Sequence, residues 1–139
     1  MNLKRVLVVD DSEPCLRICR IALTQAGYLV AAVSSVPEAL HALAADMPDV
    51  LVCDLLLGTV GTGFDVVAAV RSFGGKAFCV AVTGLPTGEI RDNAMAAGFD
   101  AFLYKPFKPD DLVVLLADAG NQCSASQPDR TDSSTSPQA

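Results

Sequence analysis

Five short apolar runs, separated by longer segments with helical features, constrain the fold of this chain more than any other feature. The runs cover residues 6–9, 29–33, 50–53, 78–82 and 101–104. Each interval between them is long enough for one helix and two loops. The runs are continuously apolar, which is typical of strands buried on both faces of a parallel sheet. The pattern predicts an α/β fold, a doubly wound, parallel, five-stranded (βα)5 sheet.

The first and last intervening segments contain residues that favour helix boundaries. Ser12 suits an N-cap, Pro14 suits the first helical turn, and Gly27 suits the C-terminal exit of the first helix. The last helix is expected to begin near Pro109 and to stop at Gly120.

A change of composition divides the chain after residue 120. Residues 121–139 are rich in Ser, Thr, Gln, Pro and Asp and contain few apolar side chains. Such a segment buries too little apolar surface to offset the loss of conformational entropy. We therefore interpret residues 1–120 as one domain and residues 121–139 as a disordered polar C-terminal tail.

Composition and charge argue against several classes of protein. No apolar stretch approaches the roughly 18 residues that a membrane span needs, so no membrane insertion is expected. The net charge is −6 and the ten Lys and Arg residues are scattered, which argues against direct nucleic-acid binding. The five cysteines show no paired C-x-x-C spacing, and a reduced, cytoplasmic setting fits them best.

Three aspartates follow two of the predicted strands. Asp10 and Asp11 close the first run, and Asp54 closes the third. Ligand sites of open parallel sheets lie at the carboxyl ends of strands, so these side chains meet if the two strands are neighbours. Crowded carboxylates repel one another, and oxygen ligands without His or Cys favour Mg²⁺. The sequence therefore predicts a magnesium site.

Two further polar residues follow the fourth and fifth runs. Thr83 comes directly after the fourth run, and Lys105 comes directly after the fifth. A carboxylate, a metal, a hydroxyl and an ammonium at one point form a phosphoryl-transfer site. We expect Asp54 to attack phosphorus, Lys105 and Mg²⁺ to neutralise the phosphoryl oxygens, and Thr83 to donate a hydrogen bond to one of them.

Four motifs at the strand ends resemble those of the response-regulator receiver family of two-component signalling. The likeness extends from residue 4 to about residue 119. Each motif alone is common, and the specificity lies in their order and their positions at strand ends. The motifs are Val8-Val9-Asp10-Asp11, Val52-Cys53-Asp54-Leu55, Val82-Thr83-Gly84 and Tyr104-Lys105-Pro106-Phe107.

The resemblance implies further structural details. It implies the flavodoxin-like strand order 2-1-3-4-5. It also implies that Asp10, Asp11, Asp54 and the backbone carbonyl of Leu56 are the metal ligands. It also implies a cis peptide between Lys105 and Pro106. Phe102 occupies the position of the aromatic switch residue, where it would respond together with Thr83.

The resemblance further implies a function in signalling. We expect a stand-alone receiver that takes its phosphoryl group from a phosphohistidine of a sensor histidine kinase or a histidine phosphotransfer protein. Its output would be contact with a protein partner whose identity is unknown, and it would catalyse only its own phosphorylation and dephosphorylation. For donor docking we predict a small apolar patch of Cys15, Ile18, Pro106 and Phe107.

Other functions fit the residues less well. The loop Gly58–Gly63 is expected to be loose, because Gly58 stands where the receiver family usually has proline. This loop is not followed by the Lys and the hydroxyl residue that a nucleotide-binding P-loop requires. A phosphatase of the haloacid-dehalogenase type needs a second Asp where Leu56 stands. The acidic loop after the first strand is unlike the phosphate loop of a flavodoxin. A phosphorylation-independent adaptor with the same fold stays open as the alternative.

Overall fold

Five strands and five helices alternate along the chain in the computed structural model, which describes residues 4–57, 61–84 and 88–125. The strands are parallel and lie in the order β2-β1-β3-β4-β5. The predicted doubly wound sheet and its strand order are therefore confirmed. The elements are β1 (Arg5–Val9), α1 (Glu13–Gln25), β2 (Leu29–Val33), α2 (Val36–Ala45), β3 (Val50–Asp54), α3 (Gly63–Ser72), β4 (Phe78–Thr83), α4 (Gly88–Ala97), β5 (Ala101–Tyr104) and α5 (Pro109–Ala125).

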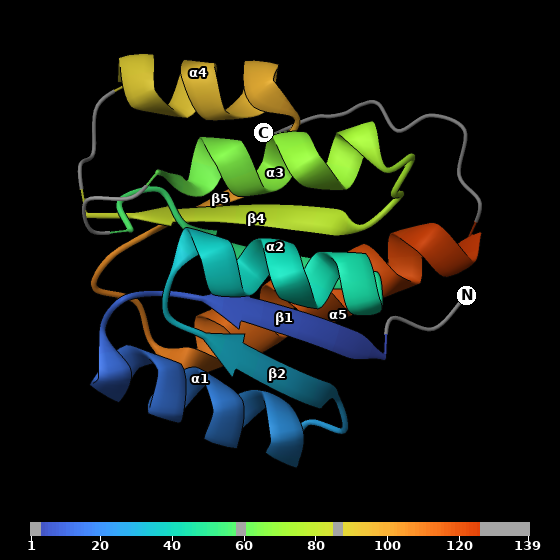
Figure 1. The fold of residues 1–139 in the computed structure, drawn as a ribbon. Helices are drawn as coiled ribbons and strands as arrows, with labels where there is room; N and C mark the ends of the chain where they lie inside the picture. Colours follow the sequence, from blue (N-terminus) through green and yellow to red (C-terminus); the bar gives the residue numbers. More distant parts are fainter. Residues whose placement is uncertain (1–3, 58–60, 85–87, 126–139) are drawn as a thin grey trace.

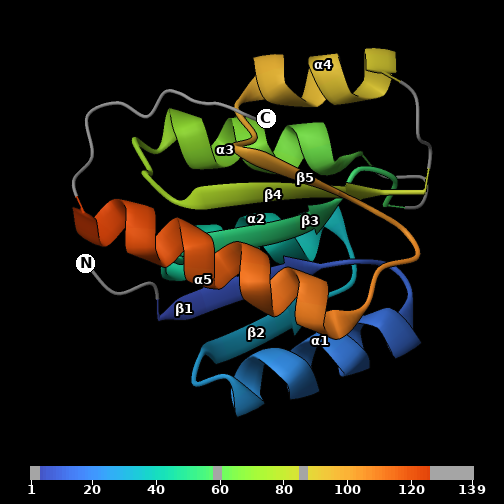
Figure 2. The ribbon, with the colours of Figure 1, turned by 180° about the vertical axis from the view of Figure 1, so that it is seen from behind.

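Helices cover both faces of the sheet. Helices α2, α3 and α4 pack on one face, and α1 and α5 pack on the other (Figures 1 and 2). The central strand β3 is buried along its whole length, as expected for a strand with helices above and below it. Each face contributes its own apolar core cluster, so the sheet is a rigid platform for the residues at its carboxyl edge.

The boundaries of α1 agree with the sequence prediction. The Ser12 hydroxyl accepts a hydrogen bond from the Cys15 amide at 3.4 Å, and Pro14 lies in the first turn. Gly27 follows the helix with φ of 103°, in the left-handed region that glycine adopts readily.

The predicted end of the last helix is wrong. Helix α5 passes through Gly120 and continues to Ala125. A glycine inside a helix costs only about 1 kcal/mol relative to alanine, and no proline follows before Pro128. The proposed division into a domain and a disordered tail stays a prediction, because residues 126–139 lie outside the described residues.

Within the ranges that the structure describes, none of the helices combines the length and apolar character that a bilayer crossing requires.

Candidate functional site

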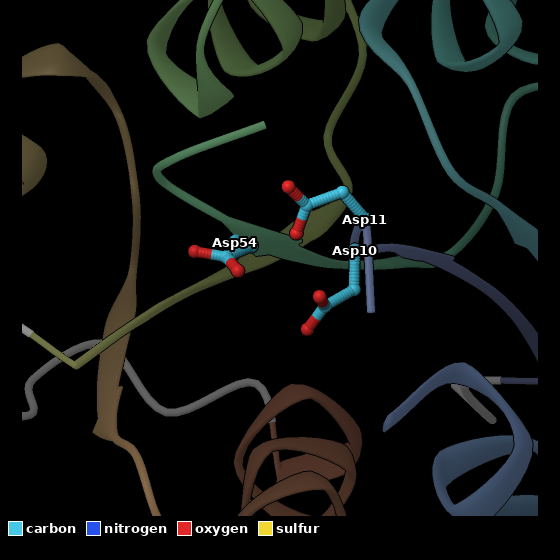
Figure 3. A group of neighbouring side chains, drawn as sticks. All are labelled: Asp10, Asp11 and Asp54. Atoms are coloured by element: carbon cyan, nitrogen blue, oxygen red, sulfur yellow. The ribbon is translucent and has the colours of Figure 1, made fainter. Parts of the chain in front are cut away.

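Three carboxylates gather at the carboxyl edge of the sheet. Strands β1 and β3 are paired neighbours, with Val9 opposite Cys53, so Asp10 and Asp11 emerge beside Asp54. One carboxylate oxygen of each aspartate lies within 4.8 Å of those of the other two (Figure 3). Asp10 and Asp54 are buried and Asp11 is exposed. The predicted convergence of these three residues is confirmed.

Lys105 brings a positive charge to the same point from the end of β5. Its ammonium nitrogen lies 2.7 Å from Oδ2 of Asp10 and 2.9 Å from Oδ2 of Asp54. The Lys105 amide donates a hydrogen bond to the Thr83 carbonyl at 2.8 Å, which anchors the lysine to β4. The peptide between Lys105 and Pro106 is cis, as the resemblance implied.

Backbone amides fix the remaining carboxylate oxygens. The Ser12 amide donates to Oδ1 of Asp10 at 2.9 Å, and the Leu56 amide donates to Oδ1 of Asp54 at 3.1 Å. The carbonyl of Leu56 as a metal ligand stays a prediction. Because both of its oxygens have a hydrogen-bond partner, the Asp54 carboxylate is held in a defined orientation.

The two members of the ion pair have altered proton affinities. Burial raises the pKa of Asp54, and the hydrogen bond and charge of Lys105 oppose that rise only in part. Burial lowers the pKa of Lys105, but the hydrogen bonds and charges of Asp10 and Asp54 outweigh it, and the net pKa is raised. Lys105 is therefore a permanent cation at neutral pH.

Thr83 and Phe102, the two residues expected to respond together, lie on the adjacent strands β4 and β5. Thr83 is buried at the end of β4. Phe102 in β5 is partly buried and packs against the core cluster between the sheet and helices α2, α3 and α4. Sequence reasoning missed Tyr104, whose ring packs edge-on against Phe102 with centroids 5.0 Å apart. The signal was present, since residues two apart in a strand project from the same face.

The residues predicted for donor docking line one groove beside Lys105. Cys15 and Ile18 on α1 face Pro106 and Phe107 across a cavity of about 490 Å³. Ile18 is 50% exposed, whereas Phe107 is partly buried. A hydrogen bond with Cys19, burial and the nearby Asp10 carboxylate raise the pKa of Cys15, so its thiol is protonated at neutral pH.

The loop after β3 is closed by the start of α3. Thr62 caps this helix and forms a capping box with Asp65. At Gly63 a Cβ atom would lie 2.5 Å from the Asp54 carbonyl oxygen, so only glycine permits this approach. The expected looseness of the Gly58–Gly63 loop stays a prediction, because residues 58–60 lie outside the described residues.

The donor set fits a hard divalent cation. The three clustered side chains offer only carboxylate oxygens, the ligands that Mg²⁺ prefers. Asp11 is exposed, which leaves an open side for water or phosphoryl oxygens. The arrangement places three carboxylates and one cation at a single point, which are groups that a phosphoryl-transfer site needs.

Comparisons with known proteins agree with this arrangement. The family model described as "Response regulator receiver domain" matches residues 6–117. The alginate biosynthesis transcriptional regulatory protein AlgB of Pseudomonas aeruginosa is 38% identical over 113 residues, which cover 81% of this chain and 25% of AlgB. This chain covers about half of the length of other curated regulators that it matches.

Solved structures of related sequence have a fold similar to that of this chain. Chemotaxis protein CheY4 of Vibrio cholerae is 30% identical, with a TM-score of 0.78, covering 84% of this chain and 98% of that chain. A response regulator protein from Burkholderia pseudomallei, solved with a phosphorylated aspartic acid and a calcium ion, is 25% identical. Its TM-score is 0.76, and the match covers 88% of this chain and 72% of that chain.

Proposed function

The chain belongs to the response regulator receiver domain family, and from that premise we propose that Asp54 accepts a phosphoryl group from a phosphohistidine. The donor is a sensor histidine kinase or a histidine phosphotransfer protein. One observation carries the proposal: the Lys105 ammonium bridges Asp10 and Asp54 inside a pocket of carboxylates. A structural ion pair has no need of the additional carboxylate of Asp11, whereas a phosphoryl-transfer site needs both a metal site and a cation.

The chemistry is an in-line displacement at phosphorus. An oxygen of Asp54 forms a bond to phosphorus while the bond from phosphorus to the donor's imidazole nitrogen breaks. The imidazole leaves with the electron pair of that bond, and an acyl phosphate remains on Asp54. Lys105 shifts to the phosphoryl oxygens as their charge develops, and the Thr83 hydroxyl donates to one of them.

Asp10, Asp11, Asp54 and the Leu56 carbonyl are the groups that would hold Mg²⁺ here. When bound, the ion neutralises charge on the phosphoryl oxygens and lowers the repulsion between them and the carboxylates. The exposed carboxylate of Asp11 is reachable from solvent, which supports loading of the ion without opening the fold.

The output of the phosphorylated chain is a change in protein contacts. The phosphoryl group biases two packing states at Thr83 and Phe102, and a partner protein reads the difference. The chain covers nearly all of the chemotaxis protein CheY4, which supports an output through protein contacts of the receiver fold itself. The only reactions that the chain catalyses are its own phosphorylation and dephosphorylation, and its acidic charge argues against direct contact with nucleic acid.

Labelling with acetyl phosphate and Mg²⁺ tests the proposal. The wild-type chain gains the mass of one phosphoryl group, and Asp54→Asn gains none while it keeps its circular dichroism spectrum. Asp118→Asn, which removes an exposed carboxylate from α5, serves as the control and labels normally. No mass gain in the wild type would favour the phosphorylation-independent adaptor.

A further inference from the structure

Tyr104 lies between the two residues that are expected to respond to phosphorylation. In the parallel pairing of β4 with β5, Thr83 is the partner of Tyr104, and Ala81 is the partner of Phe102. Paired residues of neighbouring parallel strands are about 5 Å apart and project from the same face of the sheet. The direct neighbour of Thr83 on β5 is therefore Tyr104, and Phe102 is a diagonal neighbour.

The ring of Tyr104 also contacts the ring of Phe102. The two ring planes are inclined at 70° in an edge-to-face arrangement. Phe102 packs partly against the core cluster, whereas Tyr104 is 43% exposed at the carboxyl edge of β5. Tyr104 is thus the strand neighbour of the buried Thr83 and the ring contact of Phe102, and its own side chain reaches the molecular surface.

We propose that Tyr104 transmits the displacement of Thr83 to Phe102 and presents the change to a protein partner. This inference rests on the proposed function, because the displacement begins when Thr83 turns toward a phosphoryl group on Asp54. Movement of Thr83 changes the space beside the Tyr104 ring, and closely packed rings respond by turning together. Tyr104 also carries at the exposed edge the hydroxyl that Phe102 lacks, so the partner is one that offers a hydrogen-bonding group there.

The sequence provides a direct probe of Tyr104. The chain has no tryptophan and two tyrosines, Tyr28 and Tyr104. Tyr28 packs against the core cluster on the opposite face of the sheet. Tyr28→Phe therefore leaves Tyr104 as the single tyrosine fluorophore, and Tyr104→Phe is the matched variant that reports only on Tyr28.

The first experiment measures tyrosine emission before and after addition of Mg²⁺ and beryllofluoride, a stable phosphoryl mimic. The emission of Tyr28→Phe should change, and that of Tyr104→Phe should stay nearly constant. Adding Thr83→Ala to the Tyr28→Phe background should remove most of the change. An unchanged emission of Tyr104, or a change that persists without the Thr83 hydroxyl, would overturn the inference.

The second experiment tests transmission to Phe102 by NMR. Beryllofluoride should shift the Phe102 ring resonances in wild type and in Tyr28→Leu, and most of this shift should be lost in Tyr104→Leu. The rate of labelling by acetyl phosphate should be equal in all three proteins, which separates transmission from damage to the site. Equal Phe102 shifts with and without Tyr104 would refute transmission.

The mass gain distinguishes failure of this inference from failure of the proposed function. If Tyr28→Phe gains no phosphoryl group from acetyl phosphate and Mg²⁺, the proposed function is refuted, and the inference that rests on it is refuted too. If the mass gain occurs and the Tyr104 emission stays constant, only the role of Tyr104 is refuted.

Discussion

The ammonium of Lys105, which follows β5, lies 2.9 Å from Oδ2 of Asp54 at the end of β3. These residues are separated in sequence by two helices and two strands, and the sheet brings them together. The same ammonium contacts Asp10, so one cation serves two buried carboxylates. The positive charge of Lys105 therefore offsets the repulsion between the two carboxylates. Loss of this charge should destabilise the carboxyl edge of the sheet.

Lys105→Met should lower the free energy of unfolding by about 1–3 kcal/mol, because the carboxylates of Asp10 and Asp54 lose their cationic partner. Mg²⁺ should restore part of the loss, since it supplies positive charge to the same oxygens. Urea unfolding with and without Mg²⁺ measures both effects. Lys76→Met, at an exposed lysine far from the carboxylates, is the control, and equal losses in the two variants would contradict the prediction.

Asp54→Asn should stabilise the metal-free protein at neutral pH. Burial raises the pKa of Asp54 above its ordinary value of 3.8, so the folded state disfavours the ionised form. The folded state then binds the proton more readily than the unfolded state does. The contribution of this group to stability is present in full below pH 3.8 and is lost as the pH rises through the raised pKa.

The stabilisation by Asp54→Asn should accordingly shrink as the pH falls, because protonated aspartate and asparagine are both neutral. Thermal unfolding of the two metal-free proteins between neutral and acidic pH measures the difference. A stabilisation that grows toward acidic pH would show that Asp54 is held in its ionised form.

Most of the fold follows from the continuous apolar runs, because a strand buried on both faces tolerates few polar residues. The observed strands differ from the predicted runs by at most one residue at either end. The meeting of Asp10 with Asp54 required more than this pattern, since it depends on β1 and β3 being neighbours. That order came from the resemblance, because apolar runs alone carry no information on which strands pair.

Features set by side-chain packing were harder to predict. The end of α5 depends on a glycine that the helix tolerates, and propensity alone placed the stop there. The contact of Phe102 with Tyr104 follows from strand periodicity, but the edge-on geometry depends on the surrounding packing. The groove beside Lys105 was predicted only as an apolar patch, because the sequence does not show how closely α1 approaches Pro106 and Phe107.

Removal of the acidic pair should weaken Mg²⁺ binding. Asp10→Asn combined with Asp11→Asn removes two of the three carboxylates of the proposed metal site. We expect at least a tenfold rise in the dissociation constant, equivalent to about 1.4 kcal/mol, by isothermal titration calorimetry. Asp92→Asn combined with Asp118→Asn removes the same charge from exposed helix positions and should leave the affinity nearly unchanged. Similar losses in both double variants would indicate a nonspecific charge effect.

Arg71 should contribute to stability without influencing the site. Its guanidinium donates to the carbonyls of Gly75, Ala77 and Gly98 and to the carboxylate of Asp100, joining α3 to the segments before β4 and β5. Arg71→Met removes the guanidinium donor from the partly buried carbonyls, while Asp100 keeps the hydrogen bond from the Cys79 amide. The loss should cost about 1–3 kcal/mol of unfolding free energy. Urea unfolding measures the loss, and labelling by acetyl phosphate in the native range should be unchanged. A strong loss of labelling would mean that the two ends of the sheet are coupled.

Two isoleucines on α1 allow a matched test of donor docking. Ile18 is 50% exposed and lines the groove beside Lys105, whereas Ile21 is 51% exposed and does not line it. A glutamate at either position adds the same charge to the same helix. Any difference between the two variants therefore reports on location rather than on helix stability or net charge.

Ile18→Glu should slow phosphotransfer from the cognate phosphohistidine protein by about tenfold or more, corresponding to about 1.4 kcal/mol in the transition state. The reason is that a carboxylate in the apolar groove must be desolvated when the donor covers it. Ile21→Glu should transfer at nearly the wild-type rate. Acetyl phosphate needs no docking surface, so both variants should accept its phosphoryl group as wild type does. Slowing by both donors would show that Ile18→Glu damages the site itself, and slowing by neither would place the docking surface elsewhere.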